Sequence, residues 1–147
     1  MRFTDKIEKA INLAIDRDID DPLDIDIEDW EHYGLPVFEI DGCEYAIAHL
    51  DSDAENAATE AIKQSLWAFN SDFLAGETGL PSEVFSALSA RCEDSNDAVL
   101  SLIEKTCGLS SFVESAIASD GRGHFISPYD GDEIELENGC GYLYRIN

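Results

Sequence analysis

Residues 37–48 read VFEIDGCEYAIA, two apolar stretches separated by Asp41-Gly42. Both flanking stretches, Val37–Ile40 and Cys43–Ala48, are rich in residues that favour β-strands. Asp-Gly readily adopts the positive φ angles that a two-residue hairpin turn requires. This part of the chain is therefore predicted to form a β-hairpin.

A second hairpin is predicted near the end of the chain. Residues Glu133–Glu137 and Cys140–Ile146 flank Asn138-Gly139, which has the same turn chemistry. Alternating side chains give the first of these two strands one apolar face and one acidic face. The acidic face carries Glu133, Glu135 and Glu137.

Helical periodicity occupies the rest of the chain. A helix over residues 5–16 is expected behind Thr4 as its N-cap. Between the hairpins we expect a long helix behind a Ser52/Glu55 capping box and a short turn over 71–75. Three shorter helices follow: one from Pro81 to Cys92, one from Asp94 or Ser95 to Cys107, and one from a Ser111/Glu114 capping box to near Gly121.

Two hairpins separated by helices, without βαβ alternation, predict an α+β fold. We expect a single compact domain over residues 1–147, with several short helices packed on a small antiparallel sheet built from the two hairpins. The helices are expected to cover one side of that sheet. Residues 16–31 form an acidic extended segment within this domain.

The charge of the chain excludes several functional classes. It has 147 residues, with 32 Asp plus Glu against 9 Lys plus Arg and a net charge of −23, which opposes binding to nucleic acid. A hydrophobic content of 44% exceeds that of a disordered acidic tail. No apolar run reaches ~18 residues, and residues 1–10 contain no signal-peptide pattern. These features predict a soluble, cytoplasmic protein without membrane contact.

The four cysteines lie far apart, without a CxxC pair or zinc-ligand spacing. We expect free thiols, although two disulfides would remain open for a secreted chain. The residues are Cys43, Cys92, Cys107 and Cys140.

The acidic segment is the first candidate site. Leu23, Ile25 and Ile27 alternate with acids, as in a half-buried extended chain. Carboxylates on one face of such a chain lie about 6.6 Å apart, whereas duplex DNA carries a phosphate every ~1.7 Å of its axis. Imitation of DNA therefore needs a second acidic row, for which Glu133, Glu135 and Glu137 are candidates. The alternative is a solvated, partly flexible loop.

A calcium site is a weaker hypothesis for the same segment. Asp16, Asp18, Asp20 and Asp24 match positions 1, 3, 5 and 9 of an EF-hand loop. Asp21 replaces the turn glycine, and Ile27 replaces the bidentate glutamate. Only loose cation association is expected, without a metal site or cofactor.

No catalytic motif is present. The histidines, His32, His49 and His124, do not occur in His-Glu-x-x-His, and the chain lacks Gly-x-Ser-x-Gly and Walker motifs. In the glycine-rich segment 120–132, a structural interpretation is favoured. Gly121 ends a helix, Arg122 pairs with neighbouring acids and His124 is a hydrogen-bonded structural residue. We therefore expect no enzyme activity and no catalytic residues.

Two segments carry a resemblance to a known group of proteins. They are DGRGHFISPYDG at 120–131, followed by YLYRIN at 142–147, and SLWAFNSDFL at 65–74. Over about residues 37–147 the chain resembles an uncharacterised family of small acidic bacteriophage-encoded proteins. The resemblance implies a phage setting, with action inside an infected host cell, and implies no catalytic residues.

Together these observations predict a non-enzymatic phage protein of the DNA-mimic type. It would inhibit a host protein by binding its basic nucleic-acid-binding surface, in an anti-restriction, anti-CRISPR or other anti-defence role. The expected partner-binding residues are Asp16, Asp18, Asp20, Asp21, Asp24, Asp26, Glu28, Asp29, Glu133, Glu135 and Glu137. One alternative is a structural or regulatory phage protein whose acidity serves solubility or salt adaptation. Another is a small enzyme or metal-dependent factor using buried carboxylates, and a homodimer is left open.

Overall fold

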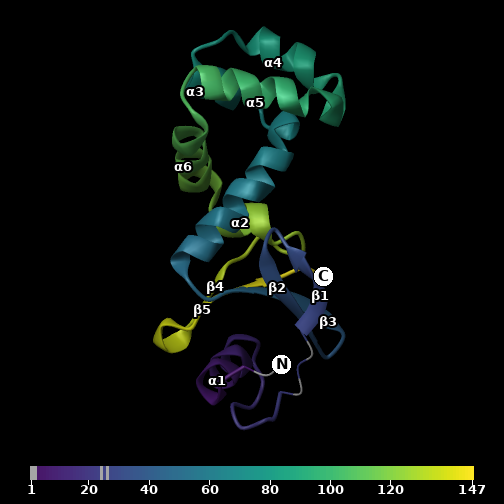
Figure 1. Ribbon diagram of the computed structural model, residues 1–147, viewed down its shortest axis with the longest axis vertical. Helices are drawn as coiled ribbons and strands as arrows, with labels where there is room; N and C mark the ends of the chain where they lie inside the picture. The colour runs from purple at the N-terminus through teal and green to yellow at the C-terminus, as the bar shows by residue number, and fades with distance from the viewer. Residues whose placement is uncertain (1–2, 24, 26) are drawn as a thin grey trace. The chain divides into compact units, whose positions relative to one another are not determined.

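The central sheet of the computed structural model contains five strands, within the described residues 3–23, 25 and 27–147. The strands are β1 (Ile27–His32), β2 (Leu35–Ile40), β3 (Cys43–Ala48), β4 (Ile134–Leu136) and β5 (Gly141–Arg145). All neighbours pair antiparallel, in the order β1-β2-β3-β5-β4. With 54% helix and 18% strand, the structure confirms the α+β class (Figure 1).

Both predicted hairpin turns are confirmed by their backbone angles. Asp41-Gly42 has φ values of 52° and 83°, and Asn138-Gly139 has 59° and 69°. Such paired positive values are typical of the turn type that matches strand twist. A third turn of this kind, Tyr33-Gly34 with φ values of 51° and 84°, joins β1 to β2 and was not predicted.

Contacts between residues divide the chain into two units, and each is described by itself. The first unit is Met1–Ala58 with Arg122–Asn147, and the second is Thr59–Gly121. The expectation of a single domain stays a prediction. Among the described residues, no helix is both long and apolar enough to span a membrane.

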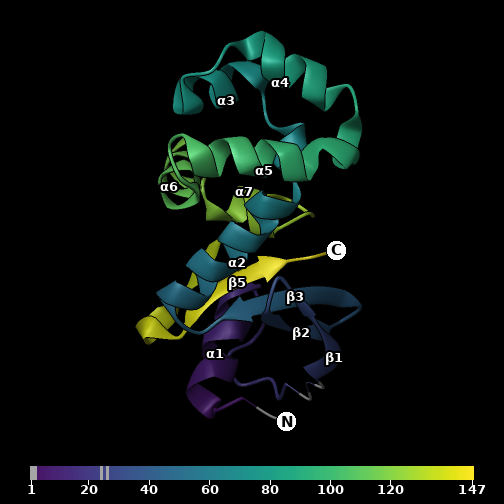
Figure 2. The ribbon, with the colours of Figure 1, turned by 45° about the horizontal axis from the view of Figure 1, so that its top comes forward.

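The first unit holds the sheet between helical segments. Helix α1 (Asp5–Ala14) begins at the predicted cap, where the Thr4 hydroxyl accepts a hydrogen bond from the Ile7 amide. It buries Ile11 in a cluster that includes Phe38 and Leu143 of the sheet. The start of α2 (Asp51–Gln64) lies on the other side of the sheet (Figure 2).

Burial on both faces corrects the expected one-sided covering of the sheet. Val37 and Ala46 are fully buried, as are Phe38 and Ile47 on the opposite face. The nearly continuous apolar run of β3 explains this, because a strand buried on both faces does not need polar alternation.

The second unit is helical. It comprises the remainder of α2, η1 (Leu66–Ala68), α3 (Ser71–Thr78), α4 (Ser82–Ser89), η2 (Cys92–Ser95), α5 (Asn96–Lys105) and α6 (Leu109–Asp120). Its buried side chains include Phe85, Val99, Ile103 and Phe112. The Asn96 side chain donates to the Lys63 carbonyl at 2.7 Å and accepts from the Trp67 amide at 3.2 Å, which fixes the end of α2.

Several predicted helix boundaries were wrong. Helix α2 begins at Asp51, so Ser52 lies inside it, and the Asp53 carboxylate instead accepts from the Leu50 amide at 3.2 Å. Helix α6 begins at Leu109 after Gly108, so Ser111 is not a cap either. Helix α4 ends at Ser89 rather than Cys92.

Two further findings concern short segments. Residues Arg122–Ile126, within the glycine-rich segment 120–132, form a helix, α7. The expected turn at 71–75 is the first part of an eight-residue helix, α3. The four cysteines are free thiols, as predicted.

Candidate functional site

The acidic segment begins with an ordered loop, residues 16–21, rather than with a fully extended chain. Helix α1 ends at Ala14, and Asp16 follows with a φ of 58°. The Asp21 amide donates to the Asp18 carbonyl at 3.0 Å, and the Asp20 amide donates to the Asp18 carboxylate at 3.0 Å. The loop is therefore held in a turn by its own carboxylate and backbone.

A buried asparagine anchors this loop to α1. Asn12 is fully buried, and its side chain donates to the Asp21 carbonyl at 2.9 Å. The same side chain accepts from the Arg17 guanidinium at 3.3 Å, and the Arg17 amide donates to the Asn12 carbonyl at 2.8 Å. Because a buried amide requires such partners, the loop conformation is coupled to the packing of α1.

The loop directs most of its carboxylates to solvent. Asp16, Asp18, Asp20 and Asp21 are exposed. Arg17, the one base in residues 16–31, lies 4.0 Å from Asp21 and 3.5 Å from Asp41. Its single positive charge leaves the loop strongly negative.

Two apolar side chains after the loop are buried. Leu23 and Ile25 are each 2% exposed, so they lie in the interior, as expected for the apolar residues of this stretch. Asp24 and Asp26, two of the predicted partner-binding residues, lie outside the described residues.

Strand β1 carries the rest of the segment along one edge of the sheet. Glu28 is half-buried, whereas Asp29, Trp30 and Glu31 are exposed. The pairing register with β2 shifts between Ile27 and Glu31. Such an irregularity with flanking charges is typical of an edge that resists pairing with another strand.

The expected second acidic row lies elsewhere. Glu133, Glu135 and Glu137 precede, occupy and follow β4, at the opposite edge of the sheet from β1. Three strands separate β4 from β1, so Glu135 lies on the order of 19 Å from the part of the segment on β1, whereas α1, which leads into the loop, packs against β4. The sequence could not have revealed this distance, because it depends on strand order.

Other acids lie beside the loop. One hollow of about 230 Å³ is lined by Asp5, Asp20 and Asp21 together with one base, Lys9. A second of about 230 Å³ is lined by Glu39 and Asp41 together with Arg17, and Pro22 lines both. We define the acidic surface as Asp5, Asp16, Asp18, Asp20, Asp21, Glu39 and Asp41. Three segments of the fold contribute to it: α1, the loop, and the β2–β3 hairpin with its turn.

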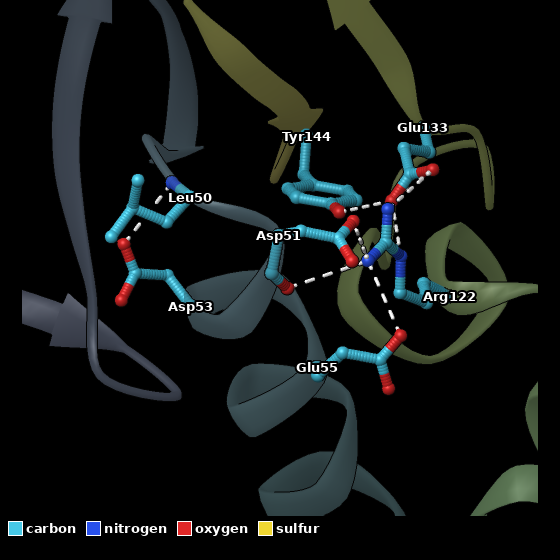
Figure 3. A network of polar contacts seen from close by, with 7 residues as sticks. All are labelled: Leu50, Asp51, Asp53, Glu55, Arg122, Glu133 and Tyr144. Atoms are coloured by element: carbon cyan, nitrogen blue, oxygen red, sulfur yellow. Dashed lines mark hydrogen bonds and ion pairs between the residues drawn. The ribbon is translucent and has the colours of Figure 1, made fainter.

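A second cluster surrounds Arg122 at the start of α7. Its guanidinium lies 2.7 Å from Asp51, 3.3 Å from Glu55 and 2.9 Å from Glu133, with its side chain 10% exposed (Figure 3). It also lies 4.6 Å from the centre of the Tyr142 ring. One cation therefore joins α2, α7 and the residue preceding β4, as the structural interpretation of Arg122 predicted.

Hydrogen bonding and burial shift the pKa values in this cluster. Hydrogen bonds and charge from Arg122 hold the pKa of Asp51 below its usual value. Burial opposes the charged form of Arg122, but bonds to Glu133 and Asp51 raise its pKa. The Tyr144 hydroxyl donates to Glu133, and burial followed by this bond raises the pKa of Tyr144. These groups hold their protonation states near neutral pH, so the cluster is suited to stability rather than proton transfer.

Two histidines lie in or against α7. His124 is exposed and lies edge-on to Phe125 at 5.0 Å, so the hydrogen-bonded role predicted for it was wrong. His32 instead donates through Nε2 to the Ile126 carbonyl at 2.6 Å and ties β1 to α7. Among the described residues, no group of three or more His, Cys, Asp or Glu is arranged to hold a metal ion.

Comparison of the chain with models of protein families, with curated proteins and with solved structures finds no match.

Proposed function

We propose that the protein is a non-enzymatic inhibitor that binds the basic nucleic-acid-binding surface of another protein through its acidic surface. The observation that carries this proposal is the anchoring of the loop through Asn12, Arg17 and Asp21. Anions held in one conformation lose little entropy on binding, whereas a flexible acidic tail must be ordered. The acidic surface is therefore preorganised for binding a partner.

The distribution of charge supports the same proposal. The first unit contains 22 acidic and 6 basic residues, and the second contains 10 and 3. The net charges are −16 and −7, so the unit with the anchored loop carries most of the excess. A negative field of this size attracts basic partners and speeds their association, and salt screens it beyond about 8 Å.

The setting follows from the resemblance to phage proteins. The protein acts in the cytoplasm of an infected bacterium, where defence nucleases and other nucleic-acid-binding proteins present basic surfaces. Occupation of such a surface excludes its nucleic acid, which accounts for inhibition without catalysis. The acidic surface lies around the loop and the β2–β3 hairpin, whereas Glu135 and Glu137 lie on and directly after β4, at the sheet edge opposite β1.

Affinity capture with matched variants tests this proposal. The test variant is Asp16→Asn, Asp18→Asn, Asp20→Asn, and the control is Asp132→Asn, Glu135→Gln, Glu137→Gln. Both remove three exposed charges from the first unit. Wild type and control should retain bacterial nucleic-acid-binding proteins that duplex DNA elutes, and the test variant should lose them. Equal retention by both variants would refute the acidic surface as the binding site.

A requirement for molar salt in folding would instead favour the alternative that acidity serves salt adaptation. That result would count against the proposal even if capture succeeded at low salt.

A further inference from the structure

Asn138 lies in the turn between β4 and β5 and is the one asparagine of the chain that precedes a glycine. It is exposed, and the described part of the chain gives its side chain no hydrogen bond. Gly139 is exposed as well, and no described atom beyond its chain neighbours lies within 4 Å of the position that a Cβ would take. The side-chain amide of Asn138 and the main-chain nitrogen after it are therefore open to water.

The other five asparagines are held by hydrogen bonds or by a helix. Asn70 has a serine after it, but its Oδ1 caps α3 by accepting from the amides of Asp72 and Phe73 at 2.8 and 3.3 Å. Asn56 lies inside α2, where the following amide is bonded along the helix. The remaining three have bonded side chains: Asn12, Asn96 and Asn147. Asn138 is therefore the least protected asparagine of the chain.

We propose that Asn138 is a site of spontaneous deamidation, with water as the co-reactant. The Gly139 nitrogen attacks the side-chain carbonyl carbon of Asn138 and forms a C–N bond, and the amide group leaves as ammonia with the proton of the Gly139 amide. Water then opens the resulting five-membered imide at either carbonyl. One product is aspartate, and the other is isoaspartate, in which the main chain runs through the former side chain. The missing Cβ of Gly139 favours the attack, because glycine permits close approach.

The turn controls how fast this reaction proceeds. Asn138 has a φ of 59° and a ψ of 29°, and the imide ring closes only after rotation about its Cα–C bond. The reaction therefore starts from an opened turn. Strand β4 is three residues long and pairs, among the described strands, with β5 alone, so few main-chain hydrogen bonds oppose such opening. Asn138 should react more slowly in the folded protein than in a free peptide, but faster than the other asparagines.

The two products have different effects on the hairpin. Aspartate suits the turn, because Asp41-Gly42 adopts the same paired positive φ values. Isoaspartate adds one carbon to the main chain and so displaces β4 from its register with β5, in which Glu135 faces Tyr142. The chain before β4 carries Glu133, which pairs with Arg122 at 2.9 Å. Isoaspartate should therefore destabilise the first unit.

Incubation of the full-length protein in mildly alkaline buffer with a reducing agent tests the proposal. Peptide mapping by mass spectrometry, with methyl transfer by an isoaspartyl methyltransferase, should detect conversion at Asn138 while Asn70 and Asn56 stay intact. In guanidinium chloride, Asn70 should convert as well, because its capping bonds are lost. Conversion of another asparagine before Asn138 in the folded protein would overturn the proposal. So would an Asn138 that lasts more than about a hundredfold longer than in a peptide of residues 133–143.

Thermal unfolding measures the effect on the hairpin. The Asn138→Asp variant reproduces one product and should melt close to wild type. After the same incubation, wild type should melt several degrees below Asn138→Asp, which forms isoaspartate more slowly because a carboxylate resists attack. Equal midpoints after full conversion would overturn the effect assigned to isoaspartate. Asn138 is outside the acidic surface, so neither result depends on the proposed function.

Discussion

Asn12 illustrates how one buried side chain organises a charged segment. It is fully buried, and its amide group contacts both Arg17 and the backbone of Asp21. The four exposed carboxylates of the loop repel one another, so the loop needs such an attachment to hold one conformation. We therefore regard Asn12 as a positioning residue for the acidic surface.

Replacement of Asn12 by alanine should loosen the loop. The Asn12→Ala variant loses the bond to the Asp21 carbonyl, and a hydrogen bond of this kind contributes about 1 kcal/mol. Hydrogen exchange at the Asp21 amide should become about fivefold faster. Asn56→Ala, at an exposed position of α2, is the control and should leave this exchange unchanged. Unchanged exchange in Asn12→Ala would show that the loop is held by other contacts.

Arg122 has a stabilising role that can be tested through Asp51. In wild type the pKa of the Asp51 carboxyl should lie below its ordinary value, and Arg122→Gln should raise it toward that value. A lowered pKa in the folded state stabilises the protein above the unfolded pKa, and this contribution is lost as pH falls through the folded pKa. Carboxyl titration by NMR measures the shift directly.

Unfolding by urea should show the same interaction. At pH 7, Arg122→Gln should lower the free energy of unfolding by about 2 kcal/mol, since charge-assisted bonds are removed from a side chain that is 10% exposed. The difference from wild type should shrink below about pH 4 as Asp51 becomes protonated. Arg91→Gln, at an exposed position, should have a smaller effect. A constant difference from pH 7 to pH 3 would contradict the assigned role.

At the scale of elements, α7 is positioned by a close backbone contact. A Cβ atom added to Gly123 would lie 2.6 Å from backbone atoms of Gly131, Asp132 and Glu133. Gly123→Ala should therefore force α7 away from the chain before β4 and lower the stability by about 2 kcal/mol. Gly76→Ala, in α3 with no atom within 4 Å, should instead stabilise the protein by up to about 1 kcal/mol. Thermal unfolding of both variants measures this contrast, and equal effects would contradict the packing of α7.

The hairpins show what local sequence can predict. Asp41-Gly42 and Asn138-Gly139 were recognised because Asp and Asn tolerate the φ angles of the turn. Tyr33-Gly34 forms an equivalent turn, but tyrosine gives no such signal, so β1 was predicted only as an extended segment. Local patterns also missed the starts of α2 and α6, where Ser52 and Ser111 have cap spacing inside the helices.

The candidate site was predictable only in part. The alternation of Leu23 and Ile25 with acids predicted which side chains are buried. The neighbours of the loop, Glu39 and Asp41, could not be found because their proximity depends on the tertiary fold. Local sequence could not predict the strand order, which places β4 far from β1, for the same reason. It also could not predict the contact between Arg122 and Asp51.

At the scale of the whole molecule, a net charge of −23 opposes compaction. Screening of this repulsion predicts that the thermal midpoint rises by several degrees between about 0.02 and 0.5 M KCl. Asp16→Asn, Asp18→Asn, Asp20→Asn should raise the midpoint at low salt and reduce its dependence on salt. A midpoint that falls as salt is added would show that surface ion pairs outweigh the repulsion.

Displacement of DNA from a captured partner tests the central claim most directly. A bacterial DNA-binding protein retained by the wild-type chain is loaded with a fluorescent duplex, and the chain is titrated against that complex. We predict that wild type and the Asp132→Asn, Glu135→Gln, Glu137→Gln control release the duplex at similar concentrations. The Asp16→Asn, Asp18→Asn, Asp20→Asn variant should require at least tenfold more protein. Binding of all three proteins without release of the duplex, or equal release by all three, would contradict the account.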